Sequence, residues 1–144
     1  MSNKNYIDAY KKSSNSMNSV KSSHEIIREL MFHLANSMDK IVLDINEYKN
    51  NEFDSKSISK KELALKKSKN MSKSLSIIYG LQTCLDFDKA PEIAGNLFQL
   101  YEFARQKVIS SLTKKDTDGI NQAITVIREI LDGWQNIAIE DRKL

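Results

Sequence analysis

Four stretches of the chain carry apolar residues at intervals of three and four positions, a spacing typical of amphipathic helices. The first stretch predicts a helix from near Ser22 to about Asn50. A capping box at its start pairs Ser22 with Glu25. Its apolar residues follow a heptad rhythm that forms one narrow seam, and they are Ile27, Met31, Leu34, Met38, Ile41, Ile45 and Tyr48.

The other three helices follow from similar signals. A second capping box, Ser59 with Glu62, opens the next helix, which ends in "DFDKAP". Pro91 then suits the first turn of a third helix, where its missing N–H costs nothing. The segment "TKKDTDG" ends the third helix, and either Asp116 or Thr117 can cap the fourth.

Four amphipathic helices joined by short connections predict an all-α fold, an antiparallel up-down four-helix bundle. We expect residues 22–140 to form this bundle domain and residues 1–21 to form a mobile N-terminal arm. The arm is polar except for Tyr6, Ile7 and Tyr10, which share one face if the segment is helical. These three residues either dock on the core of the bundle or have a functional role.

The third helix has more apolar residues than one buried face requires. Within "EIAGNLFQLYEFARQKVISSL", residues 92–112, one stripe contains Ile93, Leu97, Leu100, Ala104 and Val108. Phe98, Tyr101, Phe103 and Ile109 fall outside that stripe. The surplus predicts a docking surface for a partner, although the pattern does not divide its residues between core and surface.

Composition supports a helical protein of the cytoplasm. The 144 residues include four glycines and one proline, too few for a loop-rich β fold. Cys84 is the single cysteine, so it has no partner for an internal disulfide, as is usual in a reducing compartment. No apolar run approaches the ~20 residues of a membrane span, so we expect no membrane insertion.

Positive charge is concentrated in the first half of the chain. The formal net charge is +3, and residues 1–72 hold 13 basic and 9 acidic side chains. The excess lies in residues 56–69, "KSISKKELALKKSK", which lack arginine and aromatic side chains. Because nucleic-acid readers combine basic patches with such contacts, we interpret this run as a solvated helix start and expect no nucleic-acid partner.

The sequence contains few candidates for catalysis or metal binding. His24 and His33 lie nine residues apart on one predicted helix and therefore point to opposite sides of it. The carboxylates interleave with lysines, as on a solvated helix face. We therefore expect no enzyme activity, no metal and no cofactor. A histidine phosphotransfer domain is a less favoured alternative, since Ala35, Asn36 and Ser37 replace the lysine and glycine that usually follow its histidine.

The chain resembles the flagellar secretion chaperone family, FliS, along most of its length, from about Tyr6 to Ile137. The resemblance rests on "GLQTCLDFDKAPEIAGNLFQLYEFARQKVISSLTKKD" followed by "VIREILDGWQNI", and "NYIDAYKK" in the arm also fits. The matching positions are Leu81, Leu85, Asp86, Glu92, Ile93, Ala94, Asn96, Leu97, Leu100, Tyr101, Phe103, Lys114, Lys115, Asp116 and Trp134. The chain departs from the family where His24 follows Ser23, because members often have Ser-Pro there.

The resemblance implies a cytoplasmic export chaperone. Such a protein binds the C-terminal segment of flagellin, prevents its premature polymerisation and assists its export during flagellum assembly, with the export machinery as a further partner. A helical secretion chaperone or adaptor for another client is the alternative. We expect the client to bind a groove lined by Ile77, Ile78, Leu81, Leu97, Leu100, Tyr101, Ala104 and Val108. Until the client arrives, Tyr6, Ile7 and Tyr10 of the arm are expected to cover part of that groove.

Overall fold

The structure, a computed structural model, describes residues 21–50, 59–113 and 116–137 of the chain. These residues form four α-helices and no strand, which confirms the predicted all-α class. In chain order the helices are α2 (Ser23–Asn50), α3 (Lys60–Thr83), α4 (Pro91–Ser110) and α5 (Asp118–Gln135).

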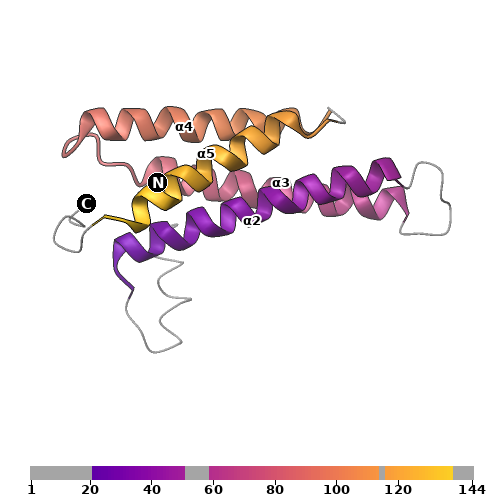
Figure 1. Cartoon of the computed structure of the whole chain (residues 1–144), viewed down its shortest axis with the longest axis horizontal. Helices are drawn as coiled ribbons and strands as arrows, with labels where there is room; N and C mark the ends of the chain where they lie inside the picture. Colours follow the sequence, from indigo (N-terminus) through magenta and orange to yellow (C-terminus); the bar gives the residue numbers. More distant parts are fainter. Residues whose placement is uncertain (1–20, 51–58, 114–115, 138–144) are drawn as a thin grey trace.

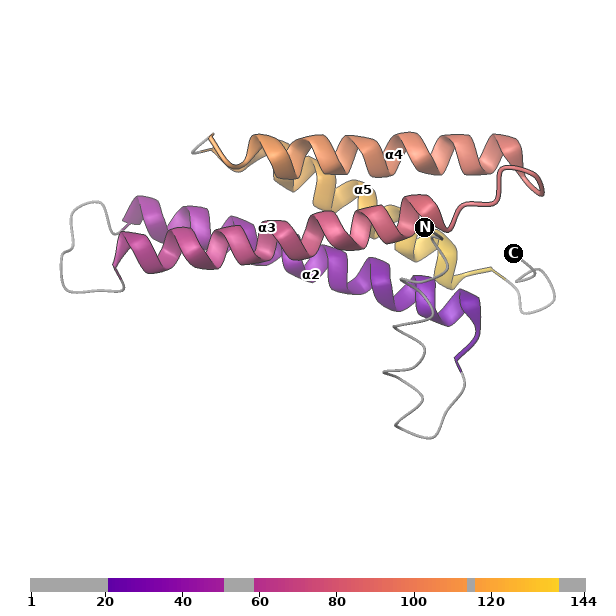
Figure 2. The ribbon, with the colours of Figure 1, turned by 180° about the vertical axis from the view of Figure 1, so that it is seen from behind.

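The four helices form an antiparallel bundle in which each helix packs against its neighbours in the chain. Contacts join α2 to α3, α3 to α4 and α4 to α5, and contacts between α2 and α5 close the ring. Two views half a turn apart place α4 along one side and the hairpin of α2 and α3 along the other (Figures 1 and 2). The bundle therefore consists of two hairpins, α2–α3 and α4–α5, and α5 runs obliquely from the end of α4 toward the start of α2.

Side chains cap the first two helices as the sequence indicates. The hydroxyl groups of Ser22 and Ser59 accept hydrogen bonds from the backbone N–H groups of Glu25 and Glu62, each at 3.2 Å. The fourth helix differs, because Thr117 stands at the cap position but its side chain makes no capping bond. Asp116 instead accepts a 3.3 Å hydrogen bond from the N–H of Asp118.

The core is apolar and draws on all four helices. The seam predicted along α2 is confirmed, because five of its seven residues are buried and Ile27 and Tyr48 are partly buried. The most deeply buried large side chains are Ile26, Leu30, Met31, Leu34, Met38, Ile41, Leu63, Ile78, Leu81, Ile120, Ile127 and Val108. Tertiary packing of these faces supplies most of the helical stability.

A polar contact in the core fixes how α2 and α3 are aligned. The hydroxyl of Ser37 on α2 donates to the backbone carbonyl of Asn70 on α3 at 3.0 Å. The amide of Asn70 donates in turn to the carboxylate of Asp44 on α2 at 2.8 Å. Both Ser37 and Asp44 are buried. Because unpaired buried polar groups are costly, these bonds disfavour sliding of one helix along the other.

A second polar contact joins the first turn of α2 to the last turn of α5. The Nε2 atom of His24 lies 2.8 Å from the backbone carbonyl of Trp134, and the indole N–H of Trp134 donates to the backbone carbonyl of His24 at 2.9 Å. The two rings stack with centroids 4.8 Å apart and an interplanar angle of 8°. Both residues are buried, so this pair holds the two helix ends together.

We predict that Trp134→Phe lowers the free energy of unfolding by about 1–2 kcal/mol, because it removes the indole hydrogen bond and leaves space in a packed site. Urea denaturation followed by circular dichroism measures this change. Tyr79→Phe is the control, since Tyr79 is 60% exposed and its substitution should change stability by less than about 0.5 kcal/mol. Equal stability of both variants would show that the pair contributes nothing.

Candidate functional site

The rotation of α4 about its own axis decides which of its apolar residues face solvent. The buried residues of this helix are Ala94, Tyr101, Ala104 and Val108. The stripe noted in the sequence is therefore only partly buried, because Ile93 is 59% exposed and Leu100 is 38% exposed. Tyr101, which fell outside that stripe, has only 2% of its surface exposed.

Tyr101 explains this rotation. Its hydroxyl reaches across the core to the sulfur of Met31 on α2, at 3.8 Å. Burial raises the pKa of the phenol well above its ordinary value of 10, so the group stays neutral. The small side chains of Ala94 and Ala104 lie on the same buried face of the helix. Small residues flanking a long aromatic side chain allow α4 to approach closely while Tyr101 fills the space beneath it.

The structure places the eight predicted groove residues mostly in the core. Six of them are buried, namely Ile77, Ile78, Leu81, Tyr101, Ala104 and Val108. Leu97 is partly buried against the core. Leu100 is the member of the set with the most exposed surface. The role of these residues in partner binding stays a prediction. The arm residues Tyr6, Ile7 and Tyr10 lie outside the described part of the chain.

An open groove lies between α4 and α5. Its volume is about 530 Å³, and its lining is formed by Asn96, Gln99, Leu100, Phe103 and Val126. We call these five residues the α4–α5 groove. The ammonium group of Lys107 lies 5.2 Å from the ring centre of Phe103, so a positive charge stands at the edge of this surface.

Sequence reasoning found part of this groove and missed the rest. Leu100 was predicted, and Phe103 was noted as surplus without an assigned place. Asn96 and Gln99 are polar, so they give no hydrophobic signal. Val126 was not singled out, although it has a sequence signal: it follows Ala123 by three residues and precedes Ile130 by four, which is the spacing of neighbours on one helix face.

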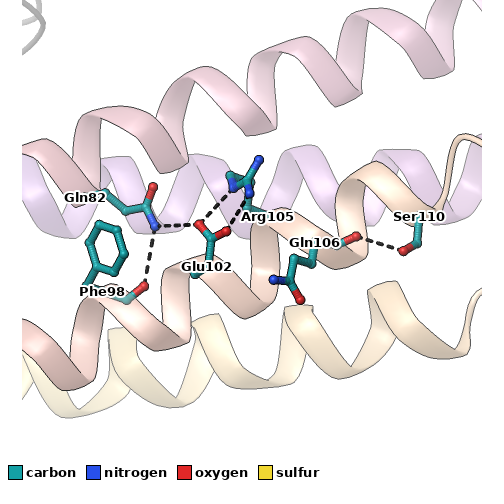
Figure 3. A network of polar contacts seen from close by, with 6 residues as sticks. All are labelled: Gln82, Phe98, Glu102, Arg105, Gln106 and Ser110. Carbon is teal, nitrogen blue, oxygen red and sulfur yellow. Dashed lines mark hydrogen bonds and ion pairs between the residues drawn. The ribbon is translucent and has the colours of Figure 1, made fainter.

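On its other flank α4 is held to α3 by a polar network (Figure 3). The side-chain amide of Gln82 donates to the backbone carbonyl of Phe98 at 3.4 Å and to the carboxylate of Glu102 at 3.2 Å. Arg105 donates to the same carboxylate, with its Nε at 2.8 Å. Hydrogen bonds from Arg105 and then Gln82 lower the pKa of Glu102 from 4.5 to about 2. The ring of Phe87 meets the ring of Phe98 edge-on beside this network, with centroids 6.3 Å apart.

The remaining candidate residues show no assembled chemical site. His33 is exposed on α2 and touches the ring of Phe32 edge-on. Cys84 is partly buried, and burial raises the pKa of its thiol. Among the residues that the structure describes, no three His, Cys, Asp or Glu side chains lie close enough together to hold a metal ion. No helix in this part of the chain is long and apolar enough to cross a membrane.

Comparison with known proteins identifies similar chains. The family model described as "Flagellar protein FliS" matches residues 6–141. The flagellar secretion chaperone FliS of Vibrio cholerae is 30% identical over 139 residues, covering 96% of this chain and 92% of the relative.

Two further relatives match over shorter stretches. The flagellar secretion chaperone FliSB of Pseudomonas aeruginosa is 33% identical over 66 residues, covering 46% of this chain and 52% of the relative. FliS of Salmonella typhimurium is 30% identical over 73 residues, with shares of 50% and 54%. No solved structure matches the chain.

We predict that Glu102→Gln destabilises the protein at neutral pH by less than about 1 kcal/mol, as for other partly exposed ion pairs. The folded-state pKa of Glu102 is depressed, so its contribution is present above pH 4.5 and is lost as the pH falls toward 2. The difference in unfolding free energy between parent and variant, measured in urea at several pH values, should therefore shrink over that window. Glu129→Gln, at an exposed carboxylate of α5, is the matched control for the loss of one negative charge. A constant difference for Glu102→Gln would contradict the assignment.

Proposed function

Because this chain belongs to the FliS family of flagellar secretion chaperones, we propose that it binds the C-terminal segment of flagellin in the cytoplasm. Binding would prevent premature polymerisation of flagellin and deliver it to the flagellar export machinery. The work is non-enzymatic, since it needs only reversible burial of an apolar segment. The observation that carries the proposal is the apolar α4–α5 groove on the surface of a chaperone-family bundle.

The groove suits an amphipathic helix in both shape and composition. A helix can lay its apolar side along Leu100, Phe103 and Val126, which is the helix-in-groove mode of peptide recognition. The amides of Asn96 and Gln99 line the same groove and offer hydrogen bonds to polar groups of the client. Ile93, seven residues before Leu100, lies on the same helix face and is 59% exposed, so it extends the apolar surface along α4.

The eight groove residues that we predicted from the sequence also remain in the proposal. Six of these residues are buried in the described bundle, so they would contact flagellin only if neighbouring residues moved aside. Leu97 and Leu100 need no such movement. The proposed binding surface is therefore centred on Leu100, and deeper residues such as Tyr101 support it from below.

We predict that Leu100→Asp weakens binding of the flagellin C-terminal segment about tenfold or more, because it removes an apolar contact and places a charge in the groove. Titration calorimetry with the flagellin segment of the same organism measures the dissociation constant. The matched control is Leu43→Asp on α2, since Leu43 is also an exposed leucine, at 64%.

The outcomes of that titration distinguish two questions: whether flagellin is the client, and where on the protein it binds. Unchanged binding by Leu100→Asp would place the flagellin surface elsewhere on the protein. No binding by a well-folded parent would favour a secretion chaperone for another client. Equal weakening in the two variants would indicate a general effect of added negative charge.

The arm is the second part of the proposal. Tyr6, Ile7 and Tyr10 would cover part of the groove in the free protein, because an unfilled apolar surface promotes aggregation. We predict that deleting residues 1–12 increases the fluorescence of a hydrophobic dye bound to the free protein. Combining the deletion with Leu100→Asp should reduce that increase if the uncovered surface is the groove. If the deletion leaves dye binding unchanged, the arm does not cover the groove in the free protein.

A further inference from the structure

A group of exposed lysines lies on the α2–α3 hairpin. Lys66, Lys69 and Lys73 of α3 are exposed and spaced three and four residues apart, so they share one helix face. Lys40 of α2 is also exposed. It lies between Ser37 and Asp44, both of which bond Asn70 of α3, so it stands at the level of Asn70. We call these four residues the lysine patch.

Two neighbouring lysines, unlike those of the lysine patch, contact other parts of the bundle. Lys67 is partly buried and donates to the backbone carbonyl of Ser111 at 3.4 Å, which ties α3 to the end of α4. Lys60 lies over the ring of Tyr48. The four patch lysines, in contrast, make no ion pair with any residue in the described ranges. Their positive charge is therefore available to a partner.

From this arrangement we infer that the lysine patch binds an acidic segment of a second protein. Glutamates spaced three and four residues apart on a partner helix match the spacing of Lys66, Lys69 and Lys73. Lys73 lies seven residue steps beyond Lys66, a distance of about 10 Å along the helix, which is two turns of such a partner. Leu65 is 59% exposed on the same helix and offers one apolar contact beside the charges.

Charge complementarity favours an acidic polypeptide over other anionic partners. Readers of nucleic acid use arginine and aromatic side chains, and the patch has neither. A membrane surface presents a broad plane of negative charge. Such a plane would also meet Glu62, which is exposed one turn before Lys66, and Glu47, one heptad after Lys40. A narrow acidic segment can follow the lysines without approaching those two carboxylates.

The inferred surface is separate from the flagellin surface and does not depend on it. The patch lysines belong to the α2–α3 hairpin, whereas the residues that line the α4–α5 groove belong to the other hairpin. A client in the groove would leave the lysine patch open. The geometry therefore allows a chaperone that holds a client on one hairpin and a second, acidic protein on the other.

The test is fluorescence anisotropy with a labelled helical peptide of alanine and glutamate in which the glutamates recur every three and four residues. The parent should bind this probe, and affinity should fall as sodium chloride is added, because exposed ion pairs are screened. Lys66→Gln with Lys73→Gln should weaken binding about two- to thirtyfold, since two exposed pairs at ~0.2–1 kcal/mol each contribute ~0.4–2 kcal/mol together.

Two controls keep this test decisive. Lys49→Gln with Lys89→Gln removes the same charge from exposed sites outside the patch and should leave affinity unchanged. Leu100→Asp in the groove should also bind the probe normally. If both lysine variants lost the same affinity for the probe, net charge alone would explain the effect, and the inference would be overturned. Failure of the folded parent to bind the probe, or preferential binding to phosphatidylglycerol vesicles over the peptide, would also overturn it.

Discussion

The burial of Tyr101 determines how α4 sits on the bundle, and the candidate site follows from that orientation. With the phenol extended toward Met31 of α2, the opposite face of α4 must point to solvent. That orientation places Leu100 and Phe103 beside α5 and places Glu102 beside Gln82 of α3. The groove and the network in Figure 3 therefore lie on two flanks of α4, and the buried side chain of Tyr101 sets the rotation of this helix.

Most of the fold follows from the sequence because helix signals are local. Heptad spacing, two serine caps and Pro91 determine where the helices run, and the structure confirms the helices and the serine bonds. The rotation of α4 is not local. Two apolar stripes are compatible with its sequence, one through Leu100 and one through Tyr101, and both have helical spacing. Only the position of α3, α5 and Met31 around α4 selects the stripe that is buried.

Contacts between residues distant in sequence were beyond prediction for the same reason. His24 interrupts the Ser-Pro pattern that the family resemblance leads one to expect, and its sequence position suggests no role. In the bundle it stacks on Trp134, 110 residues away, and the two residues bond each other's backbone carbonyls. The lysine run at the start of α3 was likewise interpreted as solvated, which the exposure of Lys66 and Lys69 agrees with. Their grouping with Lys40 depends on the Asn70 contacts that align the two helices.

The size of the α4–α5 groove limits how a client can bind. Full burial of a leucine or phenylalanine contributes ~1.5–3 kcal/mol, but Leu100 is already 62% covered and Phe103 is partly buried. Folding a disordered segment on binding costs ~2–5 kcal/mol, which these two partial contacts can barely offset. Useful affinity therefore requires contacts beyond the five groove residues, and Ile93 offers the nearest such contact, about two turns away along α4. A client on this surface must lie along the helix, since an anchor in the groove alone would bind too weakly to keep an aggregation-prone segment covered.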